Sequence, residues 1–328
     1  MTSAALDPIP LEHEYTFAPA SQTDGAPQAM HTARFYAFNT VITLQAFGEE
    51  SVAAAAFEKA LAACRRYERL FSRTLPHSDI SRINTAHGAW VDIADDTYDL
   101  LEASIFYCRE SLGAFDITIG AVTRLWDFQR SIMPEEKEIA AALEHVDYRF
   151  LETRCVDGMK SARLTDPHAA IDVGGTAKGY IADALRDLLC DCGLHHFLIN
   201  LGGNVVVCGG KPDGSPFRVG VKDPRNPEAI LAAVPIADGS VVTSGLYERA
   251  FTHNGTRYSH ILDPATGTPI ATDAESVTVV AARSTDCDGF STTLCALGIE
   301  RGSEFAKTRP ELSAVIYIDA DNKLYIAE

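Results

Sequence analysis

Apolar residues recur three or four positions apart in several stretches of this chain. Between residues 49 and 70, Val52, Ala56, Ala60, Cys64 and Tyr67 follow this spacing, which predicts an amphipathic helix. The stretch begins with acidic residues and ends with arginines, as the helix dipole favours. Similar patterns predict further helices at residues 97–112, 135–144, 176–192, 285–297 and 301–308.

Short apolar stretches bounded by turn residues predict strands between these helices. Residues 35–47 indicate a strand or hairpin, and residues 197–207 a strand interrupted by Gly202-Gly203. Further strands are predicted at residues 217–221, 230–236, 240–243, 258–262, 276–282, 314–318 and 324–327. This arrangement predicts the α+β class, with mixed or antiparallel sheets flanked by helices. Residues 1–33 show no such pattern, so we expect a partly flexible tail followed by one domain over residues 34–328.

The composition excludes several classes of protein. The chain has 328 residues, of which 46% are hydrophobic and 22% charged, values typical of globular proteins. Its net charge of −17 repels phosphate backbones, so we expect no nucleic-acid partner. No apolar run approaches the roughly 18 residues that span a bilayer, so we expect no membrane insertion.

The N-terminal residues and the cysteines favour a cytoplasmic protein. Acidic residues precede the first basic residue, Arg34, which is unlike a secretory signal. The eight cysteines include no CxxC pair, so we expect reduced thiols. Cys190 and Cys192 could form a metal or redox pair, but they end a helical pattern and are interpreted as ordinary packing residues.

The first candidate for chemistry is the segment Asp172-Val-Gly-Gly-Thr-Ala-Lys178-Gly. Its glycines lie between an apolar segment and a predicted helix start, with Lys178 in the first turn. Free backbone N–H groups and a cation at such a place can bind an anion. A tight strand-to-helix turn without a ligand explains the same pattern.

The second candidate lies on the helix predicted at residues 285–297. Asp288, Ser291 and Thr292 are three and four positions apart and therefore share a face. Their hard oxygen atoms are the ligands that Mg²⁺ prefers. The alternative is structural, with Asp288 capping a helix and the hydroxyls bonding to backbone carbonyls.

Together with other short motifs, these segments resemble the FAD:protein FMN transferases of the ApbE family. The resemblance extends from about Phe35 to the C-terminus. The motifs that carry it are Phe71-Ser-Arg, Ser78-Asp-Ile-Ser-Arg-Ile-Asn84, Gly113-Ala-Phe-Asp-Ile-Thr-Ile-Gly120, Ile171-Asp-Val-Gly-Gly-Thr-Ala-Lys-Gly-Tyr180, Asn200-Leu-Gly-Gly-Asn204, Val219-Gly-Val-Lys-Asp-Pro224, Thr243-Ser-Gly245, His260-Ile-Leu-Asp-Pro264 and Asp288–Thr292.

The resemblance implies a fold with a central cleft that holds FAD, with Mg²⁺ at its diphosphate. The implied reaction transfers the FMN part of FAD to a threonine or serine hydroxyl of a target flavoprotein through a phosphoester bond and releases AMP. Phe38 stands where the family usually has methionine, and Thr74 where it often has an aromatic ring. The implied metal ligands are Gly175, through its main-chain oxygen, Asp288 and Thr292, with Ser291 adjacent. The implied flavin contacts are Phe38, Thr74, Ala114, Phe115, Asp116, Asp172, Lys178 and Ile261.

Attack by a hydroxyl on a phosphorus atom requires a proton acceptor. His260 is the best candidate in the sequence, because an unperturbed imidazole titrates near about 6.5. A buried structural imidazole before a proline turn is the alternative, and Asp263 either orients His260 or caps that turn. Two other functions share these residues: Mg²⁺-dependent hydrolysis of FAD to FMN and AMP, and a flavin carrier without chemistry.

Overall fold

The protein is described here by a computed structural model covering residues 13–17 and 29–327. Its largest element is a nine-stranded sheet in which all neighbouring strands are antiparallel. In sheet order, the strands are β1 (His13–Thr16), β2 (Met30–Ala37), β3 (Thr40–Phe47), β7 (Phe197–Leu201), β8 (Asn204–Cys208), β11 (Gly239–Gly245), β14 (Ala274–Ala281), β15 (Leu312–Asp319) and β16 (Leu324–Ala327).

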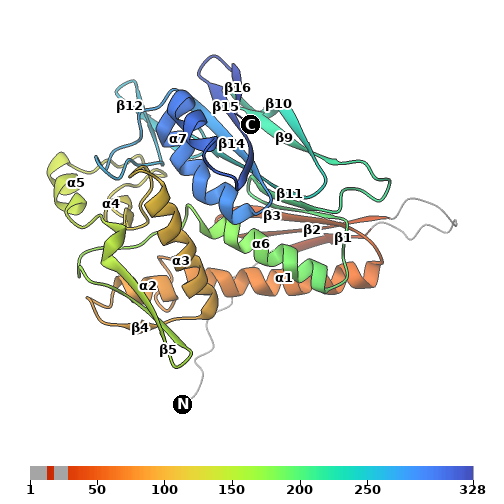
Figure 1. Cartoon of the computed structure of the whole chain (residues 1–328), viewed down its shortest axis with the longest axis horizontal. Coiled ribbons are helices and arrows are strands. Elements are labelled where there is room, and N and C mark those ends of the chain that lie inside the picture. The colour runs from red at the N-terminus through yellow and green to blue at the C-terminus, as the bar shows by residue number, and fades with distance from the viewer. Residues whose placement is uncertain (1–12, 18–28, 328) are drawn as a thin grey trace.

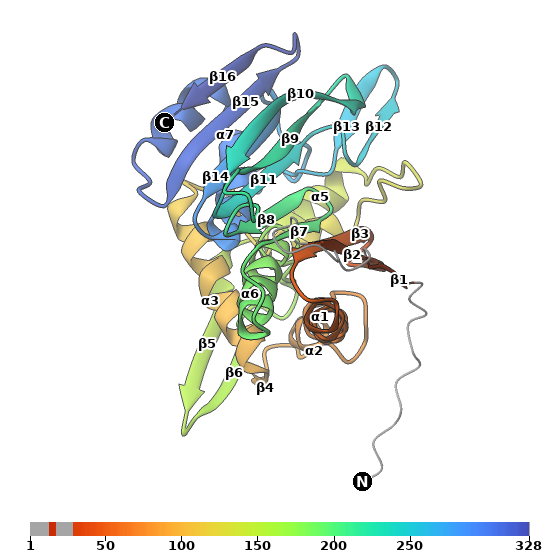
Figure 2. The ribbon, with the colours of Figure 1, turned by 90° about the vertical axis from the view of Figure 1, so that its right-hand side faces the viewer.

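Three long helices pack beside this sheet: α1 (Glu50–Phe71), α6 (Ala177–Asp191) and α7 (Ser284–Ala306) (Figure 1). Apolar side chains of these helices and the strands form the main core, in which Phe57, Phe197 and Phe290 are fully buried. The ribbon of β9 (Phe217–Asp223) and β10 (Asn226–Ile236) lies on the other side of the sheet from α6 (Figure 2). Phe217 belongs to a separate apolar cluster with Val205 of β8. The sheet therefore lies between a helical layer and a β-ribbon.

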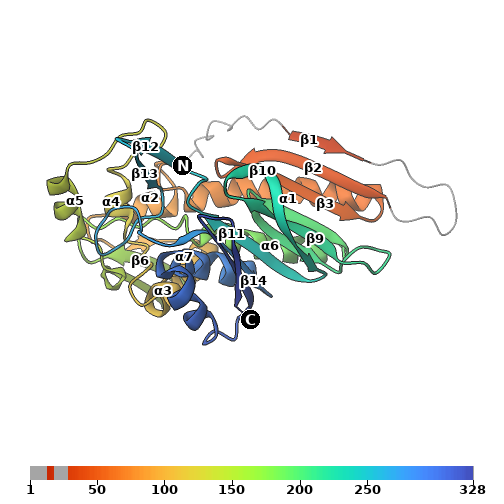
Figure 3. The ribbon, with the colours of Figure 1, turned by 90° about the horizontal axis from the view of Figure 1, so that it is seen from above.

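A smaller region adjoins the helical layer at one end (Figure 3). Its elements are α2 (Asp79–Asn84), β4 (Val91–Asp92), α3 (Asp95–Glu110), α4 (Gly120–Thr123), α5 (Glu136–Leu143), a 3-10 turn (Tyr148–Phe150), β5 (Leu151–Val156), β6 (Met159–Leu164), β12 (Ala250–His253) and β13 (Thr256–Ser259). Strands β4, β6 and β5 form a three-stranded sheet. A second apolar cluster includes Trp126, Phe251 and Leu262 and joins α4 and α5 to the β12–β13 hairpin.

Helices α6 and α7 approach closely because Gly179 has no side chain. A Cβ at this position would lie 2.5 Å from the carbonyl oxygen of Ser284 and 2.7 Å from Cβ of Asp288. Each helix also supplies a carboxylate to the first turn of the other. Asp183 of α6 accepts the backbone N–H groups of Ser284 and Thr285, and Asp288 of α7 accepts that of Gly179. These bonds satisfy backbone N–H groups that the start of a helix leaves free. They also hold the N-terminal ends of α6 and α7 next to each other.

The predicted α+β class is confirmed, and most predicted helices and strands lie within two residues of their observed bounds. Several details differ. The expected boundary at residue 33 falls inside β2, and β1 pairs with β2 although it lies in the segment expected to be a tail. The two helices predicted over 285–308 are confirmed, because α7 consists of two helical segments separated by a kink at Gly298, where φ is 75°. The strand predicted at 258–262 ends at Ser259. None of the helices in the described ranges is long and apolar enough to cross a membrane.

Candidate functional site

A cleft of about 1040 Å³ opens beside the turns that end β2 and β7 and the first turn of α6. Twelve of the thirteen residues that the sequence singled out line it. They are Phe38, Thr74, Ala114, Phe115, Asp116, Asp172, Gly175, Lys178, His260, Ile261, Asp288 and Thr292. The structure therefore gathers residues from segments that are up to 254 positions apart (292 minus 38) into one cavity.

Asp288, Lys178, Gly175 and Thr292 form a compact polar group in this cleft. The carboxylate Oδ2 of Asp288 accepts the N–H of Gly179 at 2.8 Å, while Oδ1 lies 3.8 Å from Nζ of Lys178. Burial raises the pKa of the Asp288 carboxyl, and the Lys178 charge and the Gly179 N–H partly offset this effect. A Cβ built on Gly175 would lie 3.7 Å from Oγ1 of Thr292, so these two residues adjoin.

This group suits a hard divalent cation. Oδ1 of Asp288 accepts no hydrogen bond from the described residues apart from its contact with Lys178, so it can serve as a ligand. Carboxylate, hydroxyl and main-chain oxygens are the donors that Mg²⁺ prefers, with water or phosphate oxygens completing the shell. The donor set therefore fits Mg²⁺, to which the protein would contribute one carboxylate ligand.

Ser291 is the one predicted site residue that does not line the cleft. Its side chain is fully buried, with Oγ 2.8 Å from Oγ of Ser244 on β11 and 3.0 Å from the carbonyl oxygen of Asp288. That Ser291 adjoins the metal stays a prediction, and the structure gives its hydroxyl other partners. Its hydroxyl is used to join α7 to β11.

His260 is held by its backbone, and its ring is largely buried. Its N–H donates to the carbonyl oxygen of Arg249 at 3.0 Å, and Nδ1 has no hydrogen-bond partner among the described residues. Burial lowers the pKa of His260 to about 4, helped by the charges of Arg249 and Lys178. The imidazole is therefore neutral at neutral pH and can accept a proton.

Two roles were predicted for Asp263, orienting His260 or capping the turn after it. The contacts of Asp263 correspond to the second role. Its Oδ1 accepts the N–H of Ala265 at 2.8 Å, and its carbonyl oxygen accepts that of Gly267 at 2.7 Å. Asp263 therefore caps the turn that follows His260.

The turn between β2 and β3 places Phe38 in the cleft. Phe38 and Asn39 both have positive φ, 54° and 59°, as a two-residue hairpin turn of type I′ requires. Asparagine suits position 39 because it tolerates this conformation better than most residues. Oε1 of Glu68 on α1 accepts the Phe38 N–H at 2.8 Å and stabilises the turn.

Two predicted flavin contacts, Asp116 and Asp172, are also structural anchors. Asp116 accepts the backbone N–H and hydroxyl of Thr118 and the N–H of Tyr148. Asp172 accepts the N–H of Gly174 at 2.9 Å and lies 3.2 Å from Nε of Arg73. Both carboxylates thus stabilise the loops to which they belong, and both residues line the cleft.

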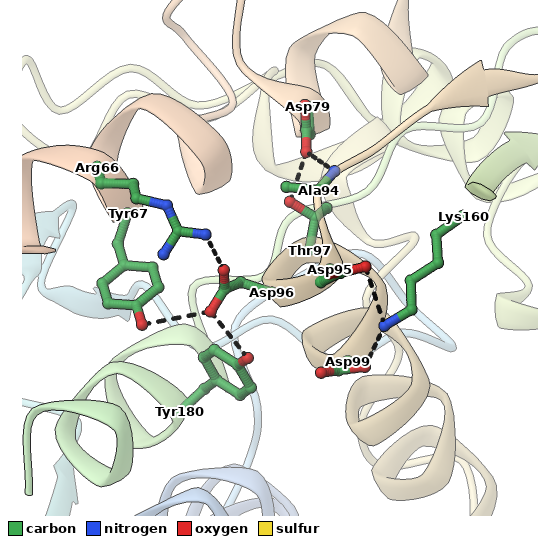
Figure 4. A network of polar contacts seen from close by, with 10 residues as sticks. All are labelled: Arg66, Tyr67, Asp79, Ala94, Asp95, Asp96, Thr97, Asp99, Lys160 and Tyr180. Atoms are coloured by element: carbon green, nitrogen blue, oxygen red, sulfur yellow. Dashed lines mark hydrogen bonds and ion pairs between the residues drawn. The ribbon is translucent and has the colours of Figure 1, made fainter. Parts of the chain in front are cut away.

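A polar network supports the aromatic wall of the cleft (Figure 4). Asp96, in the first turn of α3, lies 3.3 Å from the hydroxyls of Tyr67 and Tyr180 and pairs with Arg66. Phe71 stacks on Tyr67, with their centroids 5.4 Å apart. Tyr67 and Phe71 line the cleft, so Asp96 ties this wall to α1, α3 and α6.

Several lining residues were not assigned a role from the sequence. Among them are Tyr67, Arg73, Asn204, Lys222, Tyr247 and Arg249. Arg73, Asn204 and Lys222 belong to motifs that carried the family resemblance, so the sequence contained a signal for them. Tyr67 was assigned to the apolar face of a helix, and Tyr247 and Arg249 lie in no such motif.

The fold and the cleft define an α+β protein with a cleft lined by charged, polar and aromatic side chains. The family model described as ApbE matches residues 38–316, and the chain belongs to the ApbE family. A relative from Treponema pallidum named FAD:protein FMN transferase is 33% identical over 285 residues, 82% of this chain and 78% of the relative. One from Klebsiella pneumoniae with the same name is 35% identical, over 76% of this chain and 78% of its own.

Solved structures agree with this assignment. The ApbE protein of Thermotoga maritima has a TM-score of 0.83 and 28% identity, and the match covers 91% of this chain and 97% of that one. The flavinyl transferase ApbE of Pseudomonas stutzeri, in its apo form, has a TM-score of 0.80 and 26% identity, with 93% and 96% covered. The fold expected from the family resemblance is therefore confirmed.

Proposed function

We propose that this protein transfers the FMN part of FAD to a threonine or serine hydroxyl of a target flavoprotein, with Mg²⁺, and releases AMP. The observation that carries the proposal is the gathering of Gly175, Lys178, His260, Asp288 and Thr292 in one cleft. The names of the relatives from Treponema pallidum and Klebsiella pneumoniae support the same reaction.

In this reaction the acceptor hydroxyl oxygen attacks the phosphorus on the FMN side of the diphosphate. The new P–O bond forms as the bond to the AMP oxygen breaks. Neutral His260 takes the hydroxyl proton, a role that its lowered pKa permits. Lys178, whose ammonium group lies in the cleft beside Asp288, stabilises negative charge on the phosphate oxygens.

Mg²⁺, when bound, would neutralise charge on the diphosphate. Asp288, Thr292 and the main-chain oxygen of Gly175 are the residues that would hold it. Phe38 and the aromatic wall of Tyr67 and Phe71 would contact the flavin, because these rings supply apolar surface in the same cleft.

The proposal is tested by incubating candidate flavoproteins with this chain, FAD and Mg²⁺, followed by mass spectrometry. A covalent gain of one FMN on the candidate, together with free AMP, is the expected result. Free FMN and AMP without an adduct would instead show FAD hydrolysis. Recovery of intact FAD with every candidate would favour a carrier.

The chemistry of the acceptor can be tested separately. Peptide mapping should place the FMN on a threonine or serine, and changing that residue to alanine should remove the label. The matched control exchanges threonine and serine at this position, which keeps a hydroxyl. A label that survives the alanine change, or that maps to cysteine or histidine, would contradict the phosphoester.

We also propose that the protein acts in the cytoplasm, without nucleic acid and without inserting into a membrane. The net charge of −17 supports the absence of a nucleic-acid partner. Cell fractionation with detection of the native protein tests the location, and recovery in a membrane or exported fraction would contradict it.

A further inference from the structure

Asn204, the last residue of the Asn200-Leu-Gly-Gly-Asn204 motif, has a buried donor without a partner. Its side chain lines the cleft but is only 1% exposed. Oδ1 accepts the hydroxyl of Ser284 at 2.6 Å. Nδ2 makes no hydrogen bond to any of the described residues. A buried amide N–H without an acceptor is rare in folded proteins and calls for an explanation.

The oxygen end of this amide meets a hydroxyl group. Ser284 donates to Oδ1 of Asn204 at 2.6 Å, and Oγ of Ser240 on β11 lies 3.0 Å from both Oγ of Ser284 and the carbonyl oxygen of Val205. The backbone N–H of Ser284 is itself held by Asp183. Because the oxygen end of the amide is bound in this way, the NH₂ end is the one left without an acceptor among the described residues.

The position of Asn204 indicates which ligand atoms it can meet. Its partner Ser284 lies four residues before Asp288 on α7, and Thr292 lies four residues after it. Residues at this spacing share one helix face. Asn204 therefore lies about one helical turn from the proposed metal ligands, where the diphosphate of FAD would be bound.

We propose that Asn204 is a substrate-binding residue whose Nδ2–H donates to a phosphate oxygen of FAD. The inference rests on the proposed function, because it assumes that FAD occupies the cleft. It gives a role to a motif whose glycines form the β7–β8 turn, with φ of 61° at Gly202 and 98° at Gly203. The turn then serves to place the Asn204 amide beside the diphosphate.

The test compares two variants with a matched control. Asn204→Leu removes the donor without adding charge, and Asn204→Asp removes it but keeps an acceptor for Ser284. The control is Asn200→Asp, in the same motif. Oδ1 of Asn200 accepts the Gly203 N–H at 2.9 Å, a bond that aspartate preserves, and Asn200 does not line the cleft.

Dissociation constants for riboflavin, FMN and FAD are measured by flavin fluorescence, with and without Mg²⁺, and melting temperatures are recorded. Both Asn204 variants should bind FAD about 10- to 100-fold more weakly, the loss expected for a hydrogen bond to a charged acceptor. Riboflavin, which has no phosphate, should bind them as it binds the wild type. The control should bind all three ligands normally.

Two results would overturn the inference while leaving the proposed function intact. One is wild-type affinity for FAD in both Asn204 variants. The other is an equal loss for riboflavin and FAD, which would indicate general damage to the cleft. A wild-type protein that binds none of the three ligands would overturn the proposed function itself, and the inference with it.

Discussion

If His260 is the proton acceptor, the enzyme should retain its rate well below neutral pH. Burial, Arg249 and Lys178 lower the pKa of His260 from 6.5 to about 4. At about pH 5.5 an unshifted imidazole would be only about one tenth neutral, whereas one with a pKa of about 4 is almost wholly neutral. The acid limb of kcat/KM should therefore lie near pH 4, and the rate at about pH 5.5 should nearly equal the rate at neutral pH.

The assay is initial AMP release over a pH series, with an acceptor flavoprotein, FAD and Mg²⁺. His260→Asn should lower the rate by about 10²- to 10⁴-fold. His253, which is exposed on β12, provides the control, because His253→Asn should leave the profile unchanged. Arg249→Gln removes one of the charges that lower the pKa of His260 and should move the acid limb toward neutral pH.

The same shift has a consequence for stability with a definite sign. The unfolded chain binds a proton on His260 with a pKa near 6.5 and the folded chain only near 4, so between these values the unfolded state carries more protons. The free energy of unfolding should therefore fall as the pH drops from 6.5, by about 3 kcal/mol in total by pH 4. His260→Asn should abolish this part of the pH dependence.

Three observations would refute this reasoning. The first is an acid limb near pH 6.5 in the wild type. The second is a wild-type rate in His260→Asn at saturating FAD. The third is an unfolding free energy whose pH dependence is the same with and without His260.

Other predictions concern the paired helices. Asp288→Asn should abolish turnover at every Mg²⁺ concentration while leaving the melting temperature close to that of the wild type, since an amide oxygen can still accept the Gly179 N–H; normal turnover would contradict the metal assignment. Gly179→Ala should reduce the free energy of unfolding by about 1–3 kcal/mol, because a methyl group there collides with the Ser284 carbonyl; an unchanged denaturant midpoint would contradict the close approach of the helices. Asp183→Ala should lower the free energy of unfolding by about 2 kcal/mol, because it removes the acceptor for two N–H groups and the Thr285 hydroxyl at the start of α7. Calorimetry measures this loss. The control, Asp187→Ala on an exposed side of α6, should leave the free energy of unfolding nearly unchanged.

The helices that carry the site could be predicted from the sequence because their buried faces repeat at helical spacing. The predictions over 49–70 and 176–192 correspond to α1 (Glu50–Phe71) and α6 (Ala177–Asp191). The β5–β6 hairpin was not predicted. From Cys155 to Met159 its side chains are exposed, so this part of the hairpin lacks the apolar alternation that marks a half-buried strand.

The motifs of the sequence and its family resemblance also named twelve residues that line one cleft. The sequence left open what Asp288 does. The structure shows that Oδ2 accepts the Gly179 N–H at the start of α6 while Oδ1 lies near Lys178, so the capping oxygen and the oxygen proposed as a metal ligand are different atoms of one carboxylate. The capped N–H is 109 positions away in the sequence, and no local pattern indicates it.

Only the tertiary structure decided which polar atoms remain free to act. Ser291 and Thr292 are neighbours with similar hydroxyls, yet Ser291 bonds to Ser244 on β11 while Thr292 lines the cleft. Asn204 has its oxygen bound by Ser284 and its nitrogen left without an acceptor. A side chain's type and spacing limit what it can bind, but whether its donors and acceptors are already occupied depends on the element that packs across from it.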